Sequence, residues 1–381
     1  MNDRVSKVID YAKQLLLEND PKQNGEFTWD QERKERSWTY YTGCMMDAFL
    51  RIYRTDKTEY KAFYDWVDSF YNGLIVPDGE GYSLGDQYCL GELDSVACGH
   101  PLLSLLALEK EEGKEYNPKY LAIVDFIVSE LSKHTTFPEK ANNFIHKMNN
   151  KNWQYWSIAL DGIYMSNPFI LEQADLIEKE NPEKATEIRT AAFNRIHWVA
   201  QNLKRENGIY THAYSASTGE LNNISWLRAI GWYAMALPKV IDEVKDEEQK
   251  KILVADLKEF FDGMMKFADE ETGLWYNVVD ETNVTLPGNY LETSGSAMVA
   301  YALMHAYNRG YADRCCYEAG VKAFNSLVDK KIVTKDNGKL SVLDIYKKSG
   351  VETTKEGYLK EDNSPDEAKG TAALIMAALE V

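Results

Sequence analysis

The sequence contains few cysteines and no paired CxxC motif. Its five cysteines are an odd number, which argues against a disulfide framework and against a zinc site. The cysteines are Cys44, Cys89, Cys98, Cys315 and Cys316. Five of the histidines lack the spacing of metal ligands, so we expect no metal ion and no cofactor. They are His100, His134, His146, His197 and His305. We interpret the cysteines as reduced and expect a cytoplasmic protein.

Long apolar runs and excess positive charge are also absent. No run is long enough to cross a membrane, and the charged N-terminal stretch predicts an amphipathic helix rather than a secretory signal. The net charge of −17 makes nucleic acid an unfavourable partner. A small anionic substrate stays possible, because a few local cations can dominate inside a cleft. HExxH, Walker and GxSxG motifs are missing.

The 381 residues instead show helical periodicity almost throughout. We predict about twelve helices, with boundary errors of about two to four residues. They begin near residues 4, 38, 58, 93, 118, 161, 183, 223, 247, 291, 313 and 370. Odd-numbered helices are amphipathic and even-numbered ones are rich in small apolar residues, so the first kind should cover the second. Six such hairpins predict an all-α, closed (α/α)6 toroid formed by one domain, residues 1–381.

Shorter features interrupt these helices. Residues 208–215, 273–279 and 339–345 have strand-like patterns. Residues 335–365 are polar and charged, and predict a long loop that is either solvated or closes over a cleft. The polar and aromatic motifs fall at the starts of the even-numbered helices, so we expect them to converge on one end of the barrel.

Asp161 is the first candidate for chemistry. It lies in LDGIYMSNPF at an expected helix start, near Tyr155, Trp156, Tyr164 and Phe169. Rings around the carboxyl group would disfavour its ionised form and raise its pKa, which would allow proton donation near neutrality. Taken alone, an aspartate at this position is more commonly an N-cap.

Asp94 and His212 are further candidates. Asp94, in GELDSVACGHPLL, is predicted to face Asp161 across the barrel mouth. Paired carboxylates push their pKa values apart, so that one acts as an acid while the other orients water or stabilises positive charge. An N-cap explains Asp94 equally well. His212 lies in the strand-like GIYTHAYS, and a single histidine is more often structural.

Arg228 stands in an otherwise apolar helix, SWLRAIGWYAMAL. A buried guanidinium needs an anion, which is either a substrate carboxylate or an internal partner such as Asp94 or Glu292. Trp232 follows Arg228 by one helical turn, on the same face. The pair predicts a cation beside a stacking platform.

Taken together, these motifs resemble the unsaturated rhamnogalacturonyl hydrolases of glycoside hydrolase family 105, relatives of the unsaturated glucuronyl hydrolases of family 88. The resemblance covers nearly the whole chain. It is carried, in order, by SWTYYTG, ELDSVACG, ALDGIYMSNPF, GIYTHAYS, WLRAIGWYAMAL, ETGLWYNVVD, YLETSGSAMVAYAL and KGTAALIMAALE. The resemblance also implies a six-hairpin α/α barrel.

The resemblance implies a role for each candidate residue. Asp161 matches the general acid and base. Residues implied to bind substrate or assist are Asp94, His212, Arg228 and Trp232, with Trp38 and Tyr41 as further aromatics. A cleft lysine is matched by Lys147 or Lys151, of which we assign Lys151.

The implied partner is an oligosaccharide whose non-reducing unsaturated uronic acid is released by hydration of its C4=C5 vinyl ether. We expect galacturonyl-rhamnose units from pectin. Unsaturated glucuronyl units and a non-catalytic sugar-binding toroid are the alternatives.

Overall fold

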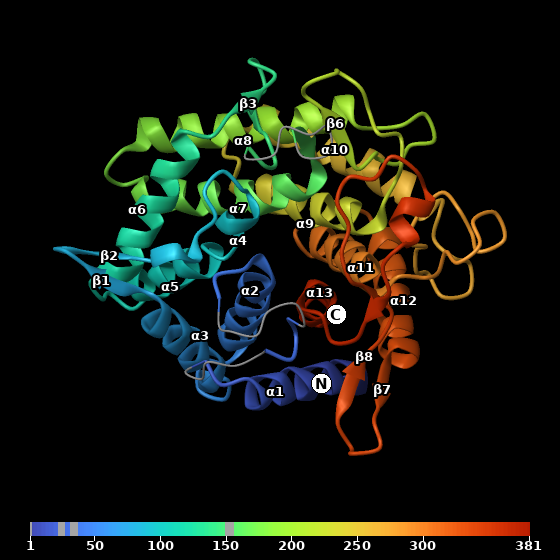
Figure 1. The fold of residues 1–381 in the computed structure, drawn as a ribbon, viewed down its shortest axis with the longest axis horizontal. Coiled ribbons are helices and arrows are strands. Elements are labelled where there is room, and N and C mark those ends of the chain that lie inside the picture. The colour runs from blue at the N-terminus through green and yellow to red at the C-terminus, as the bar shows by residue number, and fades with distance from the viewer. Residues whose placement is uncertain (1, 22–26, 31–36, 149–155) are drawn as a thin grey trace.

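The computed structural model describes residues 2–21, 27–30, 37–148 and 156–381. Within these ranges, twelve long α-helices alternate along the chain between an outer and an inner ring. One short helix, α4 (Asp94–Ala97), directly precedes the second inner helix in the chain. In Figure 1 outer helices such as α1, α8 and α12 lie at the periphery, and inner helices such as α2, α9 and α13 lie nearer the centre.

The inner ring closes on itself. Its members are α2 (Tyr40–Thr55), α5 (His100–Glu111), α7 (Leu160–Ile177), α9 (Leu227–Glu243), α11 (Thr293–Asn308) and α13 (Ala368–Ala378). Each inner helix contacts the next, and α13 contacts α2. This closure brings the N-terminal ends of helices far apart in sequence to one mouth.

The outer helices each pack against an inner neighbour. They are α1 (Asp3–Glu18), α3 (Lys61–Leu74), α6 (Pro118–Ser132), α8 (Pro182–Asn202), α10 (Glu247–Met265) and α12 (Arg314–Lys331). Nearly all residues of α11 and α13 are buried, whereas α10 and α12 expose one side. The division follows hydropathy, because a helix that is apolar all round must be covered. The predicted all-α toroid is confirmed.

Ten short strands form antiparallel pairs in the described ranges. They are β1 (Val76–Asp78), β2 (Gly81–Ser83), β3 (Thr136–Phe137), β4 (Asn143–Phe144), β5 (Ser157–Ala159), β6 (Ala213–Ser215), β7 (Ile332–Thr334), β8 (Leu340–Val342), β9 (Ile345–Tyr346) and β10 (Asn363–Ser364). Two 3-10 helices, η1 (Gly85–Gln87) and η2 (Glu356–Leu359), complete the elements. The strand expected at 273–279 forms isolated bridges only, from Tyr276 and Val278.

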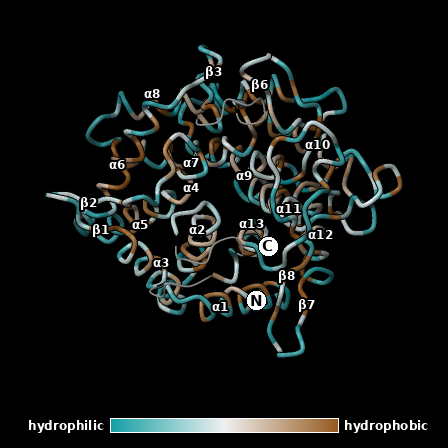
Figure 2. Tube along the Cα trace, viewed as in Figure 1, coloured by the Kyte–Doolittle hydropathy of each residue, from teal (hydrophilic) through white to brown (hydrophobic). Residues whose placement is uncertain are grey.

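The helices of the barrel and the segments that connect them differ in hydropathy. The exposed turn between β7 and β8, residues 335–339, is hydrophilic in Figure 2, whereas hydrophobic segments lie along the helices. The buried side chains of both rings form one continuous core. Among the helices in the described ranges, none has both the length and the apolar character needed to cross a bilayer.

Candidate active site

A cavity of about 330 Å³ lies at the N-terminal ends of the inner helices α2, α7 and α9. It is lined by six residues that the sequence predicted to come together: Tyr41, Asp94, Asp161, His212, Arg228 and Trp232. Residues of the C-terminal segment 335–365, including Lys348, Glu352 and Lys360, form another part of the wall. The size is in the range of about 300–1,000 Å³ that small-molecule sites occupy.

A short strand pair holds Asp161 beside His212. In the β5–β6 ladder Ala159 pairs with Ala213, and the backbone N–H of Leu160 donates to the carbonyl of His212 at 3.1 Å. The N-cap of α7 is Ala159, so Asp161 lies inside the first turn and is not a cap. Its Oδ2 lies 3.0 Å from Nε2 of His212. The strand pair therefore fixes both ends of this hydrogen bond.

The pKa of Asp161 lies below its usual value in the ligand-free protein. Burial alone raises it, but the interaction with His212, which includes a hydrogen bond from that ring, and the nearby ring of His146 together outweigh burial. The expectation of a raised pKa is therefore wrong for this state. The sequence did not indicate that a histidine donates to the carboxylate.

Asp94 belongs to a separate group of charges in the same cavity. Its Oδ2 lies 3.1 Å from Nζ of Lys147, which also lies 3.2 Å from Oε2 of Glu92. Nε2 of His146 lies 3.7 Å from Oδ1 of Asp94. The N-cap of α4 is Leu93, so Asp94 is not a cap either. The two aspartates are thus each paired with a basic residue.

Arg228 is 2% exposed and has no carboxylate partner among the described residues. Its Nη1 donates to the carbonyl of Tyr346 and lies 3.5 Å from Oγ of Ser294. The guanidinium carbon lies 5.0 Å from the ring centroid of Trp226. Glu292, which the sequence offered as a partner, instead accepts hydrogen bonds from backbone N–H groups at the start of α11. A charged, buried guanidinium therefore lines the cavity without an internal anion.

Aromatic rings form the wall around these groups. Trp232 stacks on Tyr164 with 4.9 Å between ring centroids, and Nζ of Lys369 lies 4.4 Å from the centroid of Tyr41. The cation–ring contact of Arg228 is with Trp226, whereas Trp232 is a separate ring that lines the same cavity.

Trp38 does not join the described residues that line the cavity. It is buried, and its Nε1 donates to the carbonyl of Ser95 at 2.7 Å. The structure thus places Trp38 as support for the short helix that carries Asp94.

Some residues that line the cavity were not predicted from the sequence. Lys151 lies outside the described residues, whereas Lys147, the alternative, lines the cavity. Tyr40 and His146 line it too. Tyr40 is adjacent to the predicted residue Tyr41, and this position was the signal in the sequence that could have identified it. In the sequence His146 is one of several scattered histidines, and nothing in its local sequence marks it.

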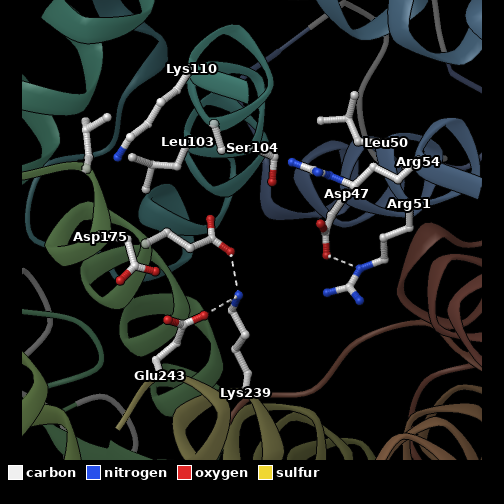
Figure 3. Close-up of a pocket in the computed structure, with 13 residues that line it drawn as sticks. Asp47, Leu50, Arg51, Arg54, Leu103, Ser104, Lys110, Asp175, Lys239 and Glu243 are labelled. Carbon is white, nitrogen blue, oxygen red and sulfur yellow. Dashed lines mark hydrogen bonds and ion pairs between the residues drawn. The ribbon is translucent and has the colours of Figure 1, made fainter. Parts of the chain in front are cut away.

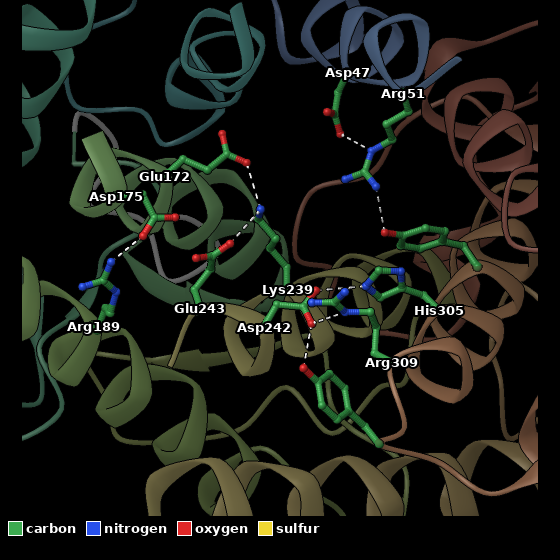
Figure 4. A network of polar contacts seen from close by, with 12 residues as sticks. Asp47, Arg51, Glu172, Asp175, Arg189, Lys239, Asp242, Glu243, His305 and Arg309 are labelled. Carbon is green, nitrogen blue, oxygen red and sulfur yellow. Dashed lines mark hydrogen bonds and ion pairs between the residues drawn. The ribbon is translucent and has the colours of Figure 1, made fainter. Parts of the chain in front are cut away.

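A second cavity, of about 320 Å³, lies toward the C-terminal ends of the same inner helices. Two of its cations are paired within the wall. Nζ of Lys239 lies 3.1 Å from Glu172 and 3.2 Å from Glu243. Arg51 pairs with Asp47 at 3.1 Å. Figure 4 shows that such pairs connect neighbouring inner helices. We interpret this region as a structural network, because Lys239 and Arg51 already have carboxylate partners within the cavity wall (Figure 3).

The sequence matches a known family model over most of its length. The model described as Glycosyl Hydrolase Family 88 matches residues 16–381. Among curated proteins, Protein Atu3128 of Agrobacterium fabrum is 32% identical in an alignment of 193 residues, which covers 45% of this chain and 82% of that protein.

Solved structures agree with this match. A glycoside hydrolase from family 105 of C. acetobutylicum is 26% identical, with a TM-score of 0.79 over 97% of this chain and 98% of that one. A possible member of the same family from Salmonella enterica is 17% identical, with a TM-score of 0.78 over 100% and 94%. An unsaturated glucuronyl hydrolase specific for heparin is 13% identical, with a TM-score of 0.70 over 100% and 97%. At such identities the last two similarities concern the fold alone.

Proposed function

Because the chain belongs to Glycosyl Hydrolase Family 88, we propose that it releases the unsaturated galacturonyl residue from the non-reducing end of rhamnogalacturonan-derived oligosaccharides. One observation carries this proposal. A single cavity contains a partly buried carboxyl group, Asp161, whose side chain is 15% exposed, and a buried guanidinium, Arg228, that has no carboxylate partner among the described residues. The first suits proton transfer and the second suits a uronate carboxylate.

Arg228 supports an anionic sugar as the substrate. Burying an unpaired charge is costly, and a bidentate carboxylate compensates for it better than water does. Lys147 adds a second cation to the same cavity, although Glu92 and Asp94 already pair with it. The uronate group therefore has one clear recognition site, on Arg228.

Asp161 supplies the acid in this proposal. The unsaturated uronic acid is a vinyl ether, and a proton delivered to C4 generates positive charge at C5 and the ring oxygen. The resulting carboxylate then takes a proton from the water that attacks C5. The hemiketal collapses and releases the aglycone. A positioned acid and base of this kind contributes about 10²- to 10⁴-fold.

The substrate itself helps to protonate Asp161. Its carboxylate brings a like charge into the cavity and displaces water, and both effects raise the pKa of a neighbouring carboxyl group. Binding should therefore be coupled to uptake of a proton, although Asp161 is ionised in the ligand-free protein. Asp94, which holds Lys147 and lies beside His146, is proposed to shape the charge distribution around the reacting ring.

The experiment is a panel of lyase-generated oligosaccharides in deuterated water. We expect loss of the conjugated ultraviolet absorbance with rhamnogalacturonan fragments, and one solvent deuterium at C4 of the product. Faster turnover of unsaturated glucuronyl oligosaccharides would replace the galacturonyl assignment with the glucuronyl one. Binding without any loss of absorbance would support a non-catalytic role, and release of the sugar without label at C4 would refute hydration.

A further inference from the structure

His212 has a polar partner on each side of its ring. Nε2 lies 3.0 Å from Oδ2 of Asp161, and Nδ1 lies 2.6 Å from Oη of Tyr358. Tyr358 belongs to η2 in the C-terminal segment and is fully buried. Glu352 and Gly357 of this segment line the candidate active site. The segment thus reaches Asp161 through one tyrosine and one histidine.

The hydroxyl of Tyr358 also accepts two hydrogen bonds whose direction is fixed. The backbone N–H of Glu352 donates at 3.1 Å and Nδ2 of Asn222 donates at 3.0 Å. The amide of Asn222 has a defined orientation, because its Oδ1 accepts from the backbone N–H of Ala213 and its Nδ2 donates to the carbonyl of Glu352. A phenolic hydroxyl has one hydrogen, and Nδ1 of His212 is the remaining acceptor.

We propose that Tyr358 is a positioning residue that donates to Nδ1 of His212 and holds this ring as the neutral tautomer with its hydrogen on Nε2, directed at Asp161. A hydrogen on Nδ1 would point at the hydroxyl oxygen of Tyr358, which already accepts hydrogen bonds from two N–H groups. It would also displace the hydrogen of Tyr358, for which the described residues provide no other acceptor. Burial raises the pKa of Tyr358, so the hydroxyl keeps this hydrogen.

The consequence for catalysis rests on the function proposed above. The imidazolium form of His212 needs a hydrogen on both ring nitrogens, and Tyr358 disfavours the one on Nδ1. A proton taken up by the pair then resides on Asp161, where the substrate can receive it. Without Tyr358, His212 takes the proton instead and, as a cation, lowers the pKa of Asp161.

Other ionisable groups face this pair from several elements. His146 precedes α7 in the chain, Arg228 lies on α9, and Glu352 belongs to the C-terminal segment, where Lys360 pairs with it at 3.1 Å. Burial lowers the pKa of His146, which favours its neutral form. Among these groups, Tyr358 is the one that contacts Nδ1 of His212.

The first test reads the tautomer directly by nitrogen NMR on histidine-labelled protein. The chain has six histidines, and His212→Gln identifies the signal. We expect a neutral ring protonated on Nε2 near pH 7, and loss of this state in Tyr358→Phe. Tyr346→Phe is the matched control, because it removes a hydroxyl of the same segment that accepts from the N–H of Glu361 and does not contact His212. Its His212 signal should be unchanged.

The second test measures activity against pH in the same variants. In Tyr358→Phe we expect the alkaline limb of the kcat profile to move to lower pH by about one unit, which corresponds to about tenfold in rate on that limb, with KM little changed. A merely structural role would lower the rate by the same factor at every pH. Melting curves verify that the variant is folded.

The outcomes separate this inference from the proposed function. An imidazolium, or a ring protonated on Nδ1, in the wild type at neutral pH would overturn the inference even if the enzyme is fully active. An unchanged tautomer in Tyr358→Phe would overturn it as well. If no unsaturated sugar is turned over, the proposed function fails, and the NMR result still decides the role of Tyr358.

Discussion

Replacing Arg228 by methionine removes the charge of the buried guanidinium but keeps a stem of similar length. The carbonyl of Tyr346 loses its donor, which costs about 1–3 kcal/mol of stability for a buried acceptor. Removing a buried charge offsets part of this cost. We therefore expect a folded protein, with a modest decrease in melting temperature, whose cavity no longer attracts an anion.

The expected loss of affinity follows from the contact that the substrate should make. A hydrogen bond to a charged group contributes about 1.5–3 kcal/mol, which corresponds to about a 10- to 150-fold increase in KM. The change in kcat should be smaller, because Arg228 binds the carboxylate both before and during the reaction and so contributes mainly to uniform binding.

The assay compares two substrates that differ in one charge. One is the unsaturated disaccharide with a free carboxylate, and the other is its methyl ester, which keeps the double bond. In Arg228→Met, KM should increase for the acid and change little for the ester. Arg51→Met is the control, since Arg51 forms an ion pair with Asp47 in the second cavity. It should change KM for neither substrate.

Equal increases in KM for the acid and the ester would refute the reasoning, because Arg228 would then support the shape of the cavity without binding the carboxylate. An unchanged KM for both substrates would mean that the carboxylate lies elsewhere in the cavity.

Two further predictions concern carboxyl groups. Asp161→Asn should lower kcat by about 10²- to 10⁴-fold while substrate still binds, as measured by calorimetry, and normal turnover would exclude Asp161 as the acid. In the second cavity, burial and a hydrogen bond with Asp175 raise the pKa of Glu243 to about 7, although Lys239 opposes the shift. The stability that this raised pKa gives to the fold is fully present below the unfolded pKa of about 4.5 and is lost as pH rises through about 7. Between pH 5 and 8 the free energy of unfolding of the wild type should therefore decrease by up to about 3 kcal/mol relative to that of Glu243→Gln, as measured by denaturation. The same pH dependence in both proteins would contradict this.

The fold could be predicted from sequence because each of its determinants is local. The periodicity of apolar residues sets helix starts, and α6 and α10 begin at residues 118 and 247, as expected. The alternation between amphipathic and apolar helices then requires one ring to cover the other. Residues 273–279 show the limit of such patterns, because strand pairing depends on a partner that the local sequence does not specify.

The sequence alone thus determined the twelve-helix toroid and the end of it at which Asp94, Asp161, His212 and Arg228 meet. Tertiary structure decided how each of these groups is charged and paired. The pKa of Asp161 is low because His212 donates to it, and His212 is oriented by Tyr358, which is 146 residues away in the chain. Electrostatic interactions depend on distances of a few ångströms in space, and these are set only when the ring of helices closes.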